Sequence, residues 1–245
     1  MEYEKMDELE KQQFNDFKRK MNQQAAEAQV KKLEYNLTDA SQDRAFLRRA
    51  CQDANILKLG AVCVLPALVK PCVAFLGPDP KVSLIACISY PHGGDSVKTK
   101  VAAVKNAIKD GVDEVEVTAP VAYIKDANWS YVKREFKKLK SAAKKRAIRI
   151  NIESALLTTQ EIAKVCAIAI DCGIPSLRTG SGFYGAGFNA DVVAHVGEAV
   201  KDKCTIKADG IATVNDMSVA VSLGATIIGS RNAADVARII LQTAD

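Results

Sequence analysis

From about residue 33 onward, hydrophobic and polar positions follow two alternating patterns. Short runs rich in Val and Ile, typical of buried parallel strands, alternate with longer stretches whose apolar residues recur every three or four positions. In the stretch 96–110, for example, Val97, Val101 and Val104 share one helical face. The order predicts successive βα units around eight strands, at 33–38, 61–65, 81–88, 114–118, 146–153, 174–178, 205–208 and 225–229.

Eight strands in a chain of 245 residues, 48% of them hydrophobic, predict a TIM (β/α)8 barrel over 33–245. An open, doubly wound sheet is the alternative fold. Residues 1–32 are almost all strong helix formers with scattered apolar positions, and they predict an N-terminal helical extension outside the barrel repeat. This extension has two interpretations: a solvated helix that caps the barrel's base, or an arm that binds a partner.

Composition narrows the chemistry. The charged start and the lack of a long apolar run predict a cytoplasmic protein without a membrane segment. Seven cysteines, an odd number with no CxxC pair, indicate reduced residues that pack in the core. Two histidines are too few for a His-rich metal centre. We therefore expect no metal and no cofactor. The net charge of +5 favours phosphorylated ligands or acidic surfaces, and nucleic acid is not an expected partner.

One run of positive charge, 133–149, stands out. Such a run is usually the solvated face of an outer helix. The alternative is a surface for an acidic protein partner, and that surface would consist of Lys133, Lys137, Lys138, Lys144 and Lys145.

The candidate site residues lie where predicted strands end, because the active face of a barrel is formed by the carboxyl ends of its strands. The polar residues at these ends are Glu116, Glu153, Arg178, Lys207 and the turn 229–231. Cations, carboxylates and Gly/Ser loops together are typical of a site for a phosphorylated sugar, in which backbone amides hold phosphate and a lysine forms an imine.

The stretch 174–184 (IPSLRTGSGFY) contains the most informative of these ends. Gly180, Gly182 and Gly185 also spell the GxGxxG of a dinucleotide site, and Asp202 lies at a suitable distance for its acidic partner. We favour a phosphate-sugar loop, because the glycines come late in the chain and bulky aromatic residues interrupt them.

Five segments, in the same order, resemble the motifs of the deoxyribose-phosphate aldolase family, and the resemblance runs from about residue 33 to 242. They are 62–66 (VCVLP, similar to VCVNP), 90–93 (YPHG, FPHG), 111–116 (GVDEVE, GADEID), 152–158 (IESALLT, ET-x-LLT) and 224–230 (GATIIGS, GATRIGTS). The resemblance implies a TIM barrel and a class I aldolase that joins acetaldehyde to glyceraldehyde 3-phosphate through a lysine Schiff base.

The chain departs from this family at the residues that carry the chemistry. The resemblance places the Schiff-base lysine of KTSTGF at Arg178, the second lysine at Lys207 and the proton-relay aspartate at Glu116. A guanidinium stays protonated and is not nucleophilic, so Arg178 cannot form the imine. The family's DxTxL is similar to 34–37 (EYNL), and its lysine on the strand before the ET motif falls at Arg149.

The implied phosphate site is altered as well. The resemblance places it beside Gly182, Gly210, Ser230 and Arg231. The segment 207–213 (KADGIAT) is one residue shorter than the family's K-x-x-GG-IRT, and it carries an aspartate where that motif has a phosphate-cradling glycine. A carboxylate repels phosphate, so a sugar phosphate is expected to bind weakly at the barrel mouth.

Two hypotheses follow. The first is an aldolase-like protein that has lost cleavage of 2-deoxyribose 5-phosphate and serves a non-catalytic binding or interaction role. The alternative is an active class I aldolase, a carbon–carbon lyase, in which Lys207 forms the imine and Arg178 depresses its pKa.

Overall fold

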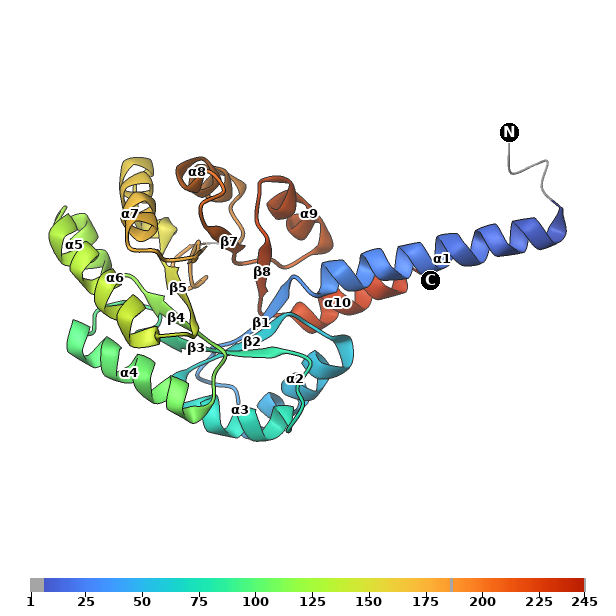
Figure 1. Ribbon diagram of the computed structural model, residues 1–245, viewed down its shortest axis with the longest axis horizontal. Coiled ribbons are helices and arrows are strands. Elements are labelled where there is room, and N and C mark those ends of the chain that lie inside the picture. The colour runs from blue at the N-terminus through green and yellow to red at the C-terminus, as the bar shows by residue number, and fades with distance from the viewer. Residues whose placement is uncertain (1–6, 186, 245) are drawn as a thin grey trace.

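The computed structural model describes residues 7–185 and 187–244 and forms one closed barrel (Figure 1). Eight parallel strands pair in chain order, and β1 pairs with β8 to close the sheet. All eight predicted strands are present, and the open-sheet alternative is wrong. The strands are β1 (Leu33–Leu37), β2 (Ala61–Val64), β3 (Ser83–Ile88), β4 (Glu114–Thr118), β5 (Ala147–Asn151), β6 (Ser176–Arg178), β7 (Thr205–Ala208) and β8 (Ile227–Ser230).

Helices surround the barrel and cover the outer face of its sheet (Figure 1). Several start where the sequence supplies a capping side chain; Ser96 accepts from the backbone N–H of Thr99, and Thr158 forms a capping box with Glu161. The helices are α1 (Glu8–Val30), α2 (Arg44–Leu57), α3 (Val69–Leu76), α4 (Val97–Asp110), α5 (Val121–Lys125), α6 (Trp129–Ala143), α7 (Thr159–Asp171), α8 (Ala190–Val200), α9 (Val214–Ser222) and α10 (Ala233–Gln242).

The alternation of side chains along each strand separates two buried regions. On β1, Leu33, Tyr35 and Leu37 belong to the large apolar core, which includes residues of the surrounding helices. The intervening Glu34 and Asn36 are also buried, and they bond to residues of β7, whose lysine lies in the interior. The closed sheet therefore keeps an apolar outer layer and collects polar side chains inside.

The described part of the N-terminal extension, residues 7–32, contains one helix, α1, which precedes β1 and extends away from the barrel (Figure 1). Its described buried residues are Ala26 and Val30, near its carboxyl end, where it runs beside α10. The long exposed part of α1 is therefore the main feature outside the barrel repeat.

The predicted charge run 133–149 divides between two environments. Helix α6 ends at Ala143, and Lys144 and Lys145 lie in the exposed connection to β5. Arg149 belongs to β5 and is 1% exposed in the barrel interior, so it is not part of the outer basic surface. Across the described residues, no helix has the length and apolar character needed to cross a bilayer.

Candidate active site in the barrel interior

Charged side chains from five strands meet inside the barrel. They come from β1, β4, β5, β6 and β7, and each is less than 10% exposed; they are Glu34, Glu116, Arg149, Arg178 and Lys207. Register places Glu116 beside Arg149, and Arg178 beside Lys207, on neighbouring strands. The structure thus brings together the three residues proposed from sequence as the altered catalytic set.

Arg178 is fully buried and fixed on both sides of its guanidinium. Nη1 bonds to Glu116, Nη2 lies 2.7 Å from Asp209 Oδ2, and Nε donates to the carbonyl of Gly180 at 2.7 Å. Burial alone would lower the pKa of Arg178, but the carboxylates of Asp209 and Glu116 outweigh it and hold the pKa well above its ordinary value. Arg178 is therefore a fixed cation at the position where the family resemblance implies the imine-forming lysine.

Lys207 is surrounded by acceptors. Its Nζ lies 2.8 Å from Glu34 Oε2 and 3.3 Å from Glu116 Oε2, and it donates to Asn36 Oδ1 at 3.1 Å. Burial alone would lower the pKa of Lys207, but Cys63, Glu116 and Glu34 outweigh that effect and raise it. At neutral pH the amine is therefore protonated and has no lone pair for attack.

The interior carboxylates are also held in ion pairs. Arg149 donates to both oxygens of Glu34, at 2.8 and 3.0 Å, and to Glu116 at 3.2 Å. Burial alone would raise the pKa of both carboxyls. Arg149 and Lys207 outweigh burial at Glu34 and lower its pKa to about 2. Three cations likewise lower the pKa of Glu116. A relay carboxylate must accept a proton before it passes it on, and the ion pairs of Glu116 disfavour its protonated form.

Asp209, expected from sequence to weaken phosphate binding, is part of the same network. One oxygen lies against Arg178 and accepts from Asn36 Nδ2 at 2.9 Å, while the other accepts from the backbone N–H of Gly210. A Cβ built on Gly229 would lie only 2.3 Å from Asp209 Oδ2. Glycine at 229 therefore makes the space in which this carboxylate reaches the interior.

The β6–α8 loop, 179–189, covers part of the barrel mouth. Tyr90, which follows β3, donates its hydroxyl proton to the carbonyl of Ser181 at 2.9 Å, and His92 Nδ1 bonds to the Tyr184 hydroxyl. Glu153 accepts from the backbone N–H of Ser181 at 3.1 Å. These contacts connect the loop to β3 and β5, and beneath it Arg178 and Lys207 are fully buried.

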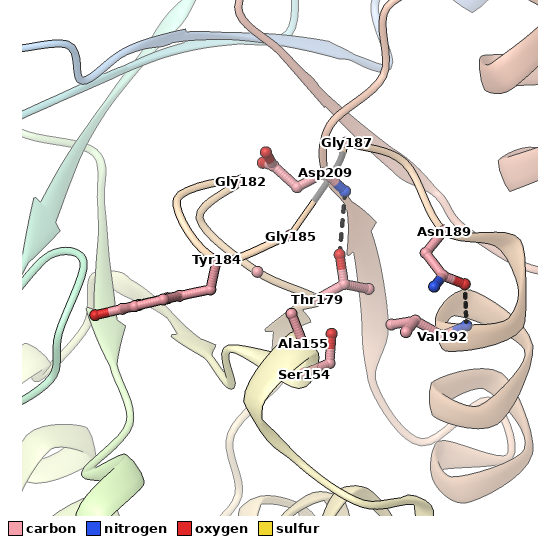
Figure 2. A pocket seen from close by; sticks show the side chains of 11 residues that line it. Ser154, Ala155, Thr179, Gly182, Tyr184, Gly185, Gly187, Asn189, Val192 and Asp209 are labelled. Atoms are coloured by element: carbon pink, nitrogen blue, oxygen red, sulfur yellow. Dashed lines mark hydrogen bonds between the residues drawn. The ribbon is translucent and has the colours of Figure 1, made fainter.

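A cavity of about 90 Å³ remains under this loop (Figure 2). Gly182 and Asp209 line it, together with Thr179, which bonds to the backbone N–H of Asp209, and Asn189 at the start of α8. This volume is small compared with that of small-molecule pockets, which usually measure about 300–1,000 Å³.

The other residues of the predicted phosphate site lie outside the lining of this cavity. Gly210 packs closely against Gly187 and Phe188, since a Cβ at 210 would come within 2.6–2.9 Å of their backbone. The Ser230 hydroxyl is buried and donates to the carbonyl of Ile211 at 2.6 Å, while Arg231 is exposed. The structure therefore does not gather these residues around one anion-sized space.

Cys63, Cys87 and Glu116 place three metal-binding atoms within 4.8 Å of one another. Lys207 Nζ, however, lies 3.3 Å from Cys63 Sγ, and Arg178 bonds to Glu116. Burial raises the pKa of the Cys63 thiol well above its ordinary value. A metal ion would have to replace cations and deprotonate a thiol, so the arrangement favours the ion pairs.

The glycines of the GxGxxG spelling do not open a helix. They lie in the β6–α8 loop, and α8 begins only at Ala190, after an Asn189 cap. A dinucleotide fingerprint requires the glycines at the turn from a strand directly into a helix, so this geometry does not support that interpretation.

Similarity to known proteins agrees with the fold. The profile of the DeoC/LacD family aldolases matches residues 34–228. The chain belongs to the DeoC/LacD aldolase family. A deoxyribose-phosphate aldolase of Clostridium botulinum (strain Loch Maree / Type A3) is 33% identical over 198 residues, which cover 77% of this chain and 93% of that relative.

Solved structures in the aldolase group share the fold. The aldolase QR15 superposes with a TM-score of 0.83 at 22% identity, covering 87% of this chain and 96% of the other. A putative deoxyribose-phosphate aldolase from Coccidioides immitis gives the same TM-score at 23% identity and covers 87% of this chain and 86% of the other.

Several residues of the site were not recognised from sequence. Glu34 and Arg149 were noted only as changed motif positions, yet they form a two-oxygen ion pair across the barrel. A signal was present, because each is a charged residue within a mostly apolar strand. For the loop contacts of Tyr90 and His92, the sequence contains no comparable signal.

Proposed function

We propose that this member of the aldolase family is a non-catalytic protein that retains the barrel as a binding scaffold. One observation carries the proposal: Arg178 occupies the position implied for the Schiff-base lysine and is paired with Glu116 and Asp209. A delocalised guanidinium held between two carboxylates has neither the lone pair nor the freedom to attack an aldehyde.

The alternative, an active lyase that uses Lys207, meets two obstacles. Lys207 Nζ is held by Glu34, Glu116 and Asn36, and its raised pKa keeps it charged. Arg178, which that hypothesis requires as the group that depresses the pKa, is itself neutralised by its carboxylates. The geometry therefore supports the non-catalytic hypothesis better.

Two experiments separate these functions. The wild-type protein should not cleave 2-deoxyribose 5-phosphate, whereas turnover on the order of 1 per second, as in ordinary enzymes, would contradict the proposal. Borohydride treatment with acetaldehyde should add no mass at Lys207, with Lys207→Met as the matched control. A mass increase that disappears in the control would instead establish the lyase hypothesis.

A binding role calls for a ligand or a partner. A phosphate or sugar phosphate remains our proposal for the cavity beside Gly182, where ion pairing to Arg178 offsets the charge of Asp209. Binding should be weak. An unchanged melting temperature with phosphate at about 10 mM would count against it.

For a protein partner, we propose an acidic surface that binds the basic outer face of α6. Lys137 and Lys138 are exposed there, and Lys144 and Lys145 are exposed in the connection that follows α6, whereas Lys133 is already paired with Asp171 at 3.2 Å. Binding through these residues should weaken with salt. A partner captured equally well after all four are changed to Glu would exclude this face.

A further inference from the structure

A second cavity lies at the amino ends of the strands, at the base of the barrel and opposite its mouth. Its volume is about 300 Å³, and Ala61, Ser83 and Glu114, the first residues of β2, β3 and β4, are part of its lining. This volume reaches the range of small-molecule pockets, about 300–1,000 Å³, whereas the cavity at the mouth measures about 90 Å³. We call this space the base cavity.

Charged side chains of both signs line the base cavity. Glu114 lies at the start of β4 and Lys32 just before β1, and no ion pair joins them. Glu114 pairs through Oε1 with Arg149 Nη2 at 3.1 Å, and among the described residues its Oε2 has no hydrogen-bond or ion-pair partner. Within residues 7–185 and 187–244, the Lys32 ammonium has no partner either. One carboxylate oxygen and one ammonium are therefore unpaired beside the same space.

Arg149 does not fully neutralise Glu114, because other carboxylates share its guanidinium. It donates to both oxygens of Glu34 and to Glu116. In the described part of the chain, three cations of this network face four carboxylates; they are Arg149, Arg178 and Lys207, and Glu34, Glu114, Glu116 and Asp209. A partly buried carboxylate with an incomplete counter-charge favours a further cation beside it.

The rest of the lining supplies hydroxyl groups and an apolar wall. Ser83 and Thr226 contribute the hydroxyls at exposed positions, while Ala61 and Ile85 are buried and belong to an apolar cluster inside the barrel. Lys31 lines the cavity as well, but its ammonium donates to the carbonyl of Lys81 at 2.9 Å. The base cavity thus combines an anionic group, a cationic group, hydroxyls and apolar surface.

We propose that the base cavity binds a small zwitterionic amino acid. The ammonium of the ligand pairs with Glu114, its carboxylate with Lys32 and the hydroxyls, and its side chain lies against Ala61 and Ile85. A simple cation would leave Lys32 unpaired, and a simple anion would leave Glu114 unpaired. A molecule with both charges pairs with both, through the charge-assisted hydrogen bonds that are stronger than neutral ones.

Thermal unfolding of the full chain with small probes tests this proposal, because a ligand of the folded protein raises its melting temperature. The probes are glycine, L-alanine, L-serine and L-leucine. Propionate and ethylamine, which are alanine without its amino group and without its carboxylate, are the controls. At about 10 mM and pH 7.5, at least one amino acid should raise the melting temperature by about 2 °C or more, and neither control should. No shift with any amino acid, or an equal shift with either control, would overturn the proposal.

Two substitutions test the location of the site. Glu114→Gln and Lys32→Met each remove one of the unpaired charges, and each should weaken binding of the amino acid at least about tenfold in calorimetric titrations. Glu198→Gln on α8 and Lys98→Met on α4 make the same changes at exposed positions, and they should bind as the wild type does. Unchanged affinity in both cavity variants would contradict the proposed site.

The pH dependence of binding tests the pairing with Glu114 without any substitution. Burial raises the pKa of Glu114 to about 6, so this carboxyl is mostly protonated at pH 5 and mostly ionised at pH 7.5. The other charged groups around it are Glu34, Glu116, Arg149 and Lys207 in the interior, and Lys31 and Lys32 at the base. Ion pairs keep the four interior groups charged throughout this range.

A free amino acid keeps both of its charges between pH 5 and 7.5, so the affinity of the wild type should fall about tenfold from pH 7.5 to 5. Equal affinity at the two pH values would overturn the pairing with Glu114. Binding at the base does not depend on the proposed loss of catalysis. A protein that binds no amino acid and lacks lyase activity would overturn only the base site, and one that binds an amino acid and has lyase activity only the non-catalytic function.

Discussion

The barrel interior and the exposed part of α1 invert the usual distribution of side chains. Inside the barrel, Arg149, Arg178 and Lys207 are at most 1% exposed, although charged residues rarely lie fully buried. Along α1, Leu9 and Phe17 are more than half exposed, although large apolar residues usually lie inside. The two regions therefore depart from the usual distribution in opposite directions.

The two regions also differ in what surrounds these unusual side chains. The interior cations pair with carboxylates of the same chain, so the charged groups of the network neutralise one another. Leu9 and Phe17 on α1, in contrast, remain largely exposed. The comparison teaches that buried charge in this protein is held by pairing within the barrel, whereas the apolar side chains on α1 lie outside that packing.

Removing one carboxylate from the interior should break the first half of this comparison most strongly. Glu116→Gln leaves three buried cations short of a partner, and loss of one member of a buried ion pair costs about 3–5 kcal/mol. Urea unfolding should show this loss. Glu198→Gln, at an exposed position on α8, is the matched control and should change stability by less than about 0.5 kcal/mol. Equal stability of the two variants would mean that the network contributes nothing.

Acid should release the same network. The pKa of Glu34 falls from 4.5 to about 2 on folding, so its contribution is present above pH 4.5 and is lost as pH falls through 2. A shift of this size corresponds to stabilisation on the order of 3 kcal/mol. Thermal unfolding between pH 7 and 2 should show this decline, and Glu34→Gln should flatten it. A wild type equally stable at pH 2.5 and 6 would contradict the ion-pair account.

The sequence predicted much of the fold and the decisive substitution, but not the network. Eight apolar runs predict the strands because each strand's outer residues pack under helices, and Arg178 follows from one motif position. The pairing of Glu34 with Arg149 spans 115 residues and exists only because the sheet closes. The barrel was predicted, but no local pattern shows which side chains meet across its interior, so Asp209 was interpreted as an obstacle to phosphate and not as the partner of Arg178.

Restoring a lysine tests whether the interior itself is non-catalytic. Arg178→Lys should leave turnover at least about 100-fold below an ordinary aldolase, because the new amine would lie between Glu116 and Asp209 and stay charged. Adding Glu116→Asp and Asp209→Gly removes these contacts and should increase borohydride trapping. Family-like turnover by the single variant, measured in a coupled assay, would show that Arg178 alone causes the loss.

The smallest effect is expected at the N-terminal end of β4. Burial outweighs the ion pair of Glu114 with Arg149 Nη2 at 3.1 Å and raises the pKa of Glu114 to about 6, so folding favours its protonated form and its ionisation opposes folding as pH rises from 4.5 through 6. Glu114→Gln should then stabilise the protein above pH 6 by up to about 2 kcal/mol, or a few degrees in melting temperature. Calorimetry at pH 4.5 and 8 should show a gain only at pH 8; a gain of the same size at both would point to packing.

The central claim is that the interior amine is permanently charged, and the charge state of Lys207 tests it most directly. Nitrogen-15 NMR of lysine side chains, with Lys207→Arg to assign the signal, reports whether the ζ-nitrogen is an ammonium or a neutral amine. Its contacts with Glu34 and Glu116 predict an ammonium signal up to at least about pH 10, the ordinary range for lysine. A Lys207 amine that is neutral near pH 7 would contradict the account and favour an active lyase.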